Sequence, residues 1–199
     1  MKLKAQNEKL FELRTKFQPI ILSGGRGKEL FFGEELVQNE NGIVISEGDN
    51  FINATYGAKG LSKMLSNLFP YEIHFKGHAA KSLEGIFQGI KHKEPEVQKV
   101  IMQYFGMDAL YTREANKIND WRESQTLYFG NQSMLRGSEQ YQQFIDELYT
   151  AALQNPLYAK AVRCAGNKTI LHSIGKDDPK QTVLTRNEFE SRLNSIKEL

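Results

Sequence analysis

The sequence lacks the features that mark secreted and membrane proteins. Its single cysteine, Cys164, excludes an intrachain disulfide and a zinc site built from several thiolates. No apolar run approaches the roughly 18 residues that a membrane-spanning helix needs. The first residues carry lysines but no long apolar stretch, unlike a signal peptide. We therefore expect an intracellular, cytoplasmic protein with no membrane partner.

The charge of the chain is nearly balanced. Lys and Arg number 26 against 24 Asp and Glu, which leaves a net charge of +2. This excess is too small to indicate general attraction to nucleic acid, although a nucleic-acid substrate in a local pocket stays possible. With 40% hydrophobic and 25% charged residues, the 199-residue chain has the composition of an ordinary globular domain.

Apolar periodicity predicts an α+β fold that is mostly helical, with a small sheet. Residues 3–17 have the pattern of an amphipathic helix, and the glycine-rich residues 18–60 favour strands and loops, with a hairpin at Asn41-Gly42. Residues 71–76 alternate as a half-buried strand, and 169–171 form another short strand. We expect one globular core over 61–199, with 1–60 as an N-terminal extension packed on it.

Capping residues predict where the helices begin and end. Helices are expected at 83–92 after Ser82, from Pro95 to a closing Gly106, and from Asp108 to about 117. Three more are expected, starting at Ser138, at Asn155-Pro156 with an end at Gly166, and at about 185.

Three motifs favour structural over chemical interpretations. The segment SGGRGKE at 23–29 lacks the first glycine and the final hydroxyl of a phosphate-binding loop, so a flexible turn is expected. His74 and His78 flank a turn, whereas His92 and His172 are isolated, and no metal site is expected. Cys164 falls within an amphipathic helix, which favours a buried structural thiol over a nucleophile.

The most informative segment is 65–91. If 83–92 is helical, Glu84, Gln88 and Lys91 share one face, since they are spaced four and three residues apart. A plain alternative is that Glu84 complements the helix dipole and that both charges are solvated. The pattern alone favours this alternative.

The same segment resembles the NADAR family, whose motif contains LSN, a proline, a strand, a glycine turn and a helix with Ser, Glu, Gln and Lys. The matching positions are Leu65, Ser66, Asn67, Pro70, Ile73, Gly77, Ser82, Glu84, Phe87, Gln88 and Lys91. Later features with counterparts are Trp121, Gln154-Asn155-Pro156, and Asp177 or Asp178. The sequence departs from the family at Gly85, where the family has histidine, at Ala80 and Lys81, where an aromatic is usual, and at Pro179, where Trp-Gly tends to follow the late aspartate.

The resemblance implies an N-glycosidase that acts on ADP-ribose derivatives or related ribosyl compounds without a cofactor. It implies catalytic roles for Glu84, as the carboxylate that stabilises a cationic sugar or activates water, and for Lys91, as a proton donor or Schiff-base nucleophile. The implied substrate-binding residues are Ser66, Asn67, Gln88, Trp121, Asp177 and Asp178. All of these except Gln88 have a structural alternative: a loop-shaping turn for Ser66 and Asn67, a loop anchor for Trp121, and a solvated turn for the two aspartates.

Three functions compete at this stage. The first is removal of ADP-ribose from guanine bases in nucleic acid, with which the upstream cations are compatible: Arg26, Lys28, Lys59, Lys63, Lys76 and Lys81. The second is hydrolysis of small ribosyl metabolites that resemble riboflavin-pathway intermediates. The third is non-catalytic binding of ADP-ribose or a nucleotide, suggested by the absence of histidine at Gly85. The sequence leaves the oligomeric state open.

Overall fold

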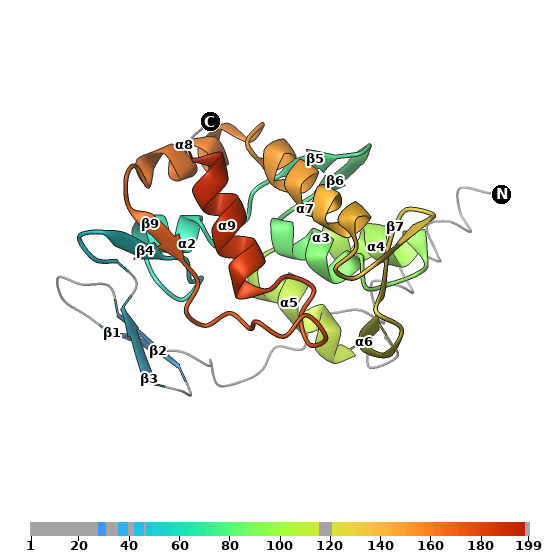
Figure 1. Ribbon diagram of the computed structural model, residues 1–199, viewed down its shortest axis with the longest axis horizontal. Helices are drawn as coiled ribbons and strands as arrows, with labels where there is room; N and C mark the ends of the chain where they lie inside the picture. Colours follow the sequence, from blue (N-terminus) through green and yellow to red (C-terminus); the bar gives the residue numbers. More distant parts are fainter. Residues whose placement is uncertain (1–27, 31–35, 40–41, 46, 116–120, 198–199) are drawn as a thin grey trace.

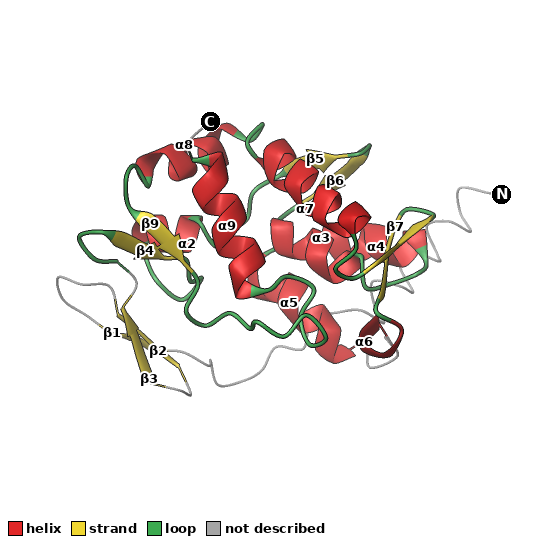
Figure 2. Cartoon of the chain, viewed as in Figure 1, coloured by secondary structure: helices red, strands yellow, loops and turns green. Residues whose placement is uncertain are grey.

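The computed structural model describes residues 28–30, 36–39, 42–45, 47–115 and 121–197, which form an α+β fold with small sheets at the edges of a central group of helices (Figure 1 and Figure 2). The predicted fold class is confirmed. The helix expected at 3–17 and residues 23–27 of the glycine-rich motif lie outside the described residues. Strands β1 (Lys28–Leu30), β2 (Leu36–Asn39) and β3 (Gly42–Ile45) form an antiparallel sheet in sequence order. Asn39 pairs with Gly42, which confirms the predicted hairpin.

A parallel pair of strands brings together two segments that are far apart in the sequence. Strand β4 (Phe51–Asn53) lies beside β9 (Thr169–Leu171), with Ile52 opposite Ile170 and both side chains fully buried. Helix α2 (Gly60–Met64) follows β4 and lies close to it in Figure 1. Part of the stretch expected as an N-terminal extension is therefore integral to the core.

Two antiparallel hairpins pack against the helices. The first joins β5 (Ile73–Phe75) to β6 (His78–Ala80), and the second joins β7 (Thr126–Phe129) to β8 (Gln132–Leu135). Ile73 and Phe75 are buried and His74 is exposed, which confirms the predicted alternation. Gly77 has φ +80°, a conformation that side-chain-bearing residues rarely adopt, so the turn between β5 and β6 favours glycine.

The helices after α2 begin close to where the sequence predicts, except α6, for which no helix was predicted. They are α3 (Leu83–Gly89), α4 (Pro95–Met102), α5 (Gly106–Ala115), α6 (Trp121–Ser124), α7 (Glu139–Ala152), α8 (Pro156–Cys164) and α9 (Arg186–Ile196). Ser82, Ser138 and Asn155 cap their helices through side-chain oxygens, and Pro95 occupies the first helical turn of α4, as predicted. The predicted role of Gly106 is wrong, because α4 already ends at Met102 and Gly106 begins α5 with φ +58°.

The core lies between the hairpins and α3, α7, α8 and α9. Phe75, Phe129 and Phe144 form a cluster of rings with centroids 5.2–5.4 Å apart. Cys164 is exposed, so the prediction of a buried thiol is wrong. The buried stripe of α8 contains Tyr158, Ala161 and Val162 and continues to Ala165, and Cys164 lies off this stripe.

Two further observations concern the described ranges only. Among them no helix combines the length and the apolar character that crossing a membrane requires. The same ranges bring together no group of three His, Cys, Asp or Glu side chains of the kind that holds a metal ion.

Candidate functional site

Helix α3 is the element that positions the candidate site. Ser82 begins it, and its Oγ accepts a hydrogen bond of 3.0 Å from the backbone N–H of Gly85. The backbone N–H of Glu84 donates to the carbonyl oxygen of Asn67 over 2.9 Å. The loop after α2 therefore lies against the first turn of α3, and the two parts of the 65–91 segment meet in space.

Glu84 and Gln88 on α3 and Lys91 in the turn just after it form a continuous polar row. Gln88 Nε2 donates to Glu84 Oε1 over 2.5 Å, and Lys91 Nζ donates to Gln88 Oε1 over 2.5 Å. Gln88 is only 4% exposed, whereas Glu84 and Lys91 are partly exposed. The buried amide thus holds the carboxylate and the ammonium group at its two ends, as the predicted shared face requires. Within the described residues, Glu84 Oε2 has no hydrogen-bond partner.

Trp121 lies beside the lysine end of this row. Its ring centroid is 5.9 Å from Lys91 Nζ and 5.1 Å from the guanidinium carbon of Arg122. The side chain is 2% exposed, so it belongs to the core, although the sequence suggested a polar loop. The ring is close to two cations, and each such contact stabilises both of its members.

Ser66 and Asn67 shape the loop that meets α3. Ser66 is buried, and its Oγ accepts from the backbone N–H of Leu68 over 3.3 Å, which closes a local turn. Asn67 Oδ1 accepts a 3.0 Å hydrogen bond from the hydroxyl of Tyr149 on α7. Burial raises the pKa of Tyr149 well above its usual value of about 10, so this hydroxyl stays protonated and donates. These contacts bind the loop to both α3 and α7.

Asp177 and Asp178 lie on the exposed loop between β9 and α9. Asp177 pairs with Arg186, the first residue of α9. Asp178 Oδ1 accepts from the backbone N–H of Lys180 over 2.9 Å, which shapes its own turn. The contacts of both carboxylates are therefore local to this loop, whereas Glu84, Gln88, Lys91 and Trp121 are brought together.

Sequence reasoning missed His172, which follows β9. Burial lowers its pKa below the usual value, although the charge of Glu84 acts in the opposite direction. A hydrogen bond of 2.7 Å joins its Nδ1 to the carbonyl oxygen of Ala54 after β4. The available signal was its place at the end of a predicted strand, where polar residues of different strands gather.

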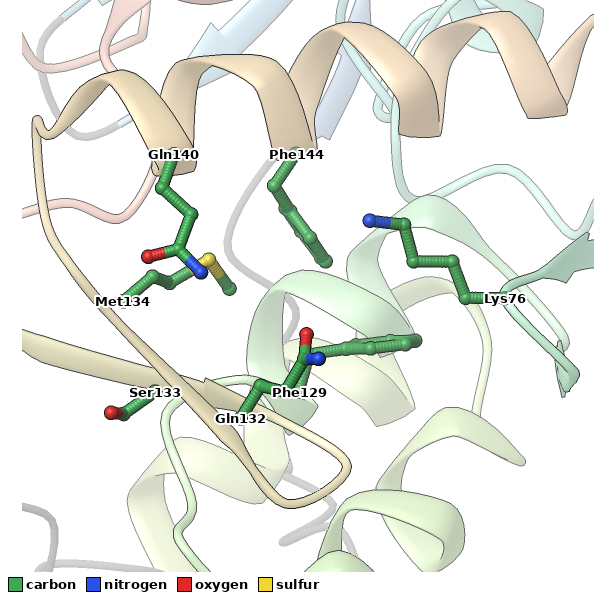
Figure 3. Close-up of a pocket in the computed structure, with 7 residues that line it drawn as sticks. All are labelled: Lys76, Phe129, Gln132, Ser133, Met134, Gln140 and Phe144. Atoms are coloured by element: carbon green, nitrogen blue, oxygen red, sulfur yellow. The ribbon is translucent and has the colours of Figure 1, made fainter.

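A separate pocket lies between the second hairpin and α7 (Figure 3). It is lined by Lys76, Phe129, Gln132, Ser133, Met134, Gln140 and Phe144, none of which was predicted as a site residue. Its volume of about 30 Å³ accommodates little more than one water molecule. We therefore place the candidate site at the polar row of α3 and not at this pocket.

Comparison with known protein families overturns the NADAR resemblance, since no model of that family matches the chain. The structure supplies the reason for the false match. Ser82 caps a helix, Gly77 makes a left-handed turn, and Leu65, Ile73 and Phe87 are buried. Residues of these types are common wherever a hairpin precedes a capped helix. Many matching positions in the same order therefore do not show that two proteins belong to one family.

Searches of curated proteins and of solved structures found no match to the chain. A family model does match, over residues 60–198, and this span contains the polar row, Trp121 and His172. The matched span is well over half of the chain. The chain therefore belongs to the family described as bacteriophage protein GP30.3.

Proposed function

We propose that this protein is an N-glycosidase that hydrolyses an N-ribosidic bond, and that its substrate is ADP-ribose attached to guanine bases in nucleic acid. The observation that carries the proposal is the row of Glu84, Gln88 and Lys91. It presents a partly exposed carboxylate whose Oε2 has no hydrogen-bond partner among the described residues. Neighbouring groups hold this carboxylate in place, which is the arrangement that glycoside cleavage requires.

The chemistry assigns a role to each group. Breaking an N-ribosidic bond passes through a cationic, oxocarbenium-like sugar, which a carboxylate close to the anomeric carbon stabilises. Glu84 would supply this charge, and the hydrogen bond from Gln88 fixes the direction of its Oε1. Lys91, at the other end of the amide, would either protonate the leaving nitrogen or attack the opened sugar as an amine.

Nearby cations support a polyanionic substrate. Lys63 belongs to α2 and precedes Asn67 by four residues, and the exposed Lys81 precedes Glu84 by three. Arg122 adds a third positive charge, 5.1 Å from the centroid of the Trp121 ring. Such groups attract the phosphates of ADP-ribose and of a nucleic-acid strand.

A substrate panel tests the proposal. The full chain would be incubated with an oligonucleotide carrying ADP-ribosylated guanine and with small N-ribosyl metabolites, and free ADP-ribose or free sugar would be quantified. We expect release from the oligonucleotide. Release from the small metabolites alone would support a metabolite N-glycosidase instead, and tight binding of ADP-ribose without turnover would indicate a binding protein.

The role of Lys91 can be tested in the same reactions. Lys91→Ala should lose most of the activity, whereas Lys99→Ala, which removes an exposed lysine of α4, should retain it. Borohydride reduction during turnover would trap a protein–sugar adduct only if the Lys91 amine attacks the sugar. Full activity of Lys91→Ala would remove this residue from the mechanism.

A further inference from the structure

The orientation of His172 fixes which of its ring nitrogens can accept a proton. Nδ1 lies 2.7 Å from the carbonyl oxygen of Ala54. A carbonyl oxygen only accepts hydrogen bonds, so Nδ1 must carry the proton in this contact. In the neutral ring, Nε2 then holds the free lone pair, which is the state of a histidine poised to act as a base.

The surroundings hold the ring and leave Nε2 available. The ring packs against Phe189 with centroids 4.7 Å apart, and the backbone N–H of His172 donates to Glu190 Oε1 over 2.7 Å. Gly175 passes so close that a Cβ there would lie 2.7 Å from His172 Cδ2. In the described part of the chain Nε2 has no hydrogen-bond partner, and the side chain is partly exposed.

Electrostatics connect His172 to the polar row of α3. Burial lowers its pKa, so the imidazole is neutral at physiological pH. The charged groups that act on it are Glu190 and Glu84, which raise its pKa, and Arg186, which lowers it. Contacts also connect the two residues. Phe189 packs against the rings of both His172 and Tyr149, the Tyr149 hydroxyl donates to Asn67 Oδ1, and the Asn67 carbonyl oxygen accepts from the backbone N–H of Glu84.

We propose that His172 is the general base of the glycosidase site, with Nε2 taking a proton from the water that attacks the anomeric carbon. This inference rests on the proposed function. The water oxygen forms the new bond to the anomeric carbon as the bond between that carbon and the guanine nitrogen breaks. The electron pair of the broken bond leaves with the guanine nitrogen. The nitrogen takes a proton from the Lys91 ammonium group, and the imidazolium and the amine then return to their initial states by exchange with solvent.

A second observation favours a ligand at this edge of the parallel strands. Thr55 follows Ala54, is 1% exposed, and its Oγ1 has no hydrogen-bond partner among the residues that the structure describes. An unpaired buried hydroxyl costs stability, and a polar ligand atom would satisfy it. Parallel strands commonly bind ligands beyond their carboxyl ends, where Thr55 and His172 both lie.

The decisive variant is His172→Asn, measured on the ADP-ribosylated oligonucleotide. The asparagine amide can donate to the carbonyl of Ala54 but has no group at the position of Nε2. We expect its turnover to fall by about 10²- to 10⁴-fold, with an unchanged melting temperature. His74→Asn, which alters an exposed histidine of β5, is the matched control and should retain full activity.

The pH profile gives a readout that does not depend on this variant. The wild-type rate should fall on acidification, because the base must be neutral, and this fall should lie below pH 6.5, since burial lowers the pKa. Glu190→Gln keeps an oxygen acceptor for the backbone N–H but removes a charge that raises the pKa. It should move the acid limb to still lower pH.

The outcomes separate the inference from the proposed function. If the wild type hydrolyses the substrate and His172→Asn keeps both the rate and the acid limb, the general-base assignment is wrong and the glycosidase stands. If the wild type hydrolyses nothing, the proposed function is wrong. NMR titration of His172 then decides whether the ring shares a site with Glu84: a lower pKa in Glu84→Gln supports the shared site, and an unchanged pKa overturns it.

Discussion

Two tyrosines of the core differ in a single hydrogen bond. Tyr149 and Tyr158 are both fully buried, on α7 and α8. The Tyr149 hydroxyl donates to Asn67, whereas within the described structure the Tyr158 hydroxyl has no partner. Burial raises the pKa of both hydroxyls, so both are neutral groups that differ only in whether the hydrogen bond is made.

This pair predicts opposite effects of the same substitution. Tyr158→Phe removes an unsatisfied hydroxyl and should raise the free energy of unfolding by about 1 kcal/mol. Tyr149→Phe leaves Asn67 Oδ1 without its donor and should lower it by about 1–2 kcal/mol. Urea denaturation of both variants measures the difference. Equal effects would show that the Asn67 contact does not hold the loop.

A buried ion pair predicts how stability depends on pH. Burial alone would raise the pKa of Glu188, but hydrogen bonds from Arg136, the backbone of Thr185 and Gln142 lower it overall. The folded-state pKa is thus below the unfolded value. The resulting stabilisation is present above the unfolded pKa, about 4.5, and is lost as the pH falls through the folded pKa.

Glu188→Gln should therefore be less stable than the wild type at pH 7 by about 3 kcal/mol, since the buried Arg136 loses its counter-ion. The difference should narrow as the pH falls from 5 toward 3. Urea denaturation across this range measures it, with Glu139→Gln as an exposed control. A difference that stays constant with pH would contradict the pairing.

At the scale of elements, α3 lies close to α4 and the residues that follow it. A Cβ at Gly85 would lie 3.0 Å from the carbonyl oxygen of Tyr104 and 3.3 Å from backbone atoms of Met102. At Gly89 the nearest contacts are the end of the Met102 side chain at 3.3 Å and the Gln98 carbonyl oxygen at 3.4 Å. No larger side chain fits at Gly85 without moving α4, which gives a packing reason for glycine there.

The different surroundings of the two glycines predict that alanine has different effects on stability at the two positions. Gly85→Ala should lower the free energy of unfolding by about 1–3 kcal/mol, because rigid backbone must shift. Gly89→Ala meets a flexible side chain and gains helix propensity of about 1 kcal/mol, so it should be neutral or stabilising. Thermal unfolding compares them. A Gly85→Ala variant as stable as Gly89→Ala would show that α3 and α4 are not in close contact.

Elements with local signals could be predicted from the sequence, and those set by tertiary contacts could not. The starts of α3, α4 and α8 follow from Ser82, Pro95 and Asn155, whose effects act within one helical turn. The role of Gly106 was misassigned because the residue that crowds this position is far away in the sequence: a Cβ there would lie 2.9 Å from the hydroxyl of Tyr56. No spacing along the chain reveals that contact.

The same limit applies to the candidate site. The row of Glu84, Gln88 and Lys91 could be predicted because its members follow one another at spacings of four and three residues, although α3 ends at Gly89 and Lys91 lies in the turn after it. His172 could not, since it reaches the site only through the pairing of β9 with β4, which joins residues 118 positions apart. The burial of Trp121 was also missed, because its neighbours in sequence are polar.

For the whole molecule, the β4–β9 pair determines how much of the chain the fold needs. Ile52 and Ala54 are fully buried, yet both precede residue 60, where the family match begins. Removing them would leave a cavity and an unpaired β9. The matched region alone is therefore an incomplete core.

Two truncated chains test this. Residues 47–199 retain β4 and should unfold cooperatively, whereas residues 60–199 should lose at least about 4 kcal/mol of stability, roughly the cost of two buried apolar side chains. Calorimetry or denaturant unfolding compares the two. Equal stability of the two truncations would contradict the role assigned to β4.

The most direct test of the central claim is the rate at which Glu84→Gln releases ADP-ribose from an oligonucleotide carrying ADP-ribosylated guanine. Glu96→Gln is the control, because Glu96 occupies the first turn of α4 as Glu84 does in α3. We expect wild-type release, a Glu96→Gln rate close to it, and a Glu84→Gln rate lower by at least about 10²-fold with the fold intact. Near-full activity of Glu84→Gln, or no release by the wild type, would contradict the account.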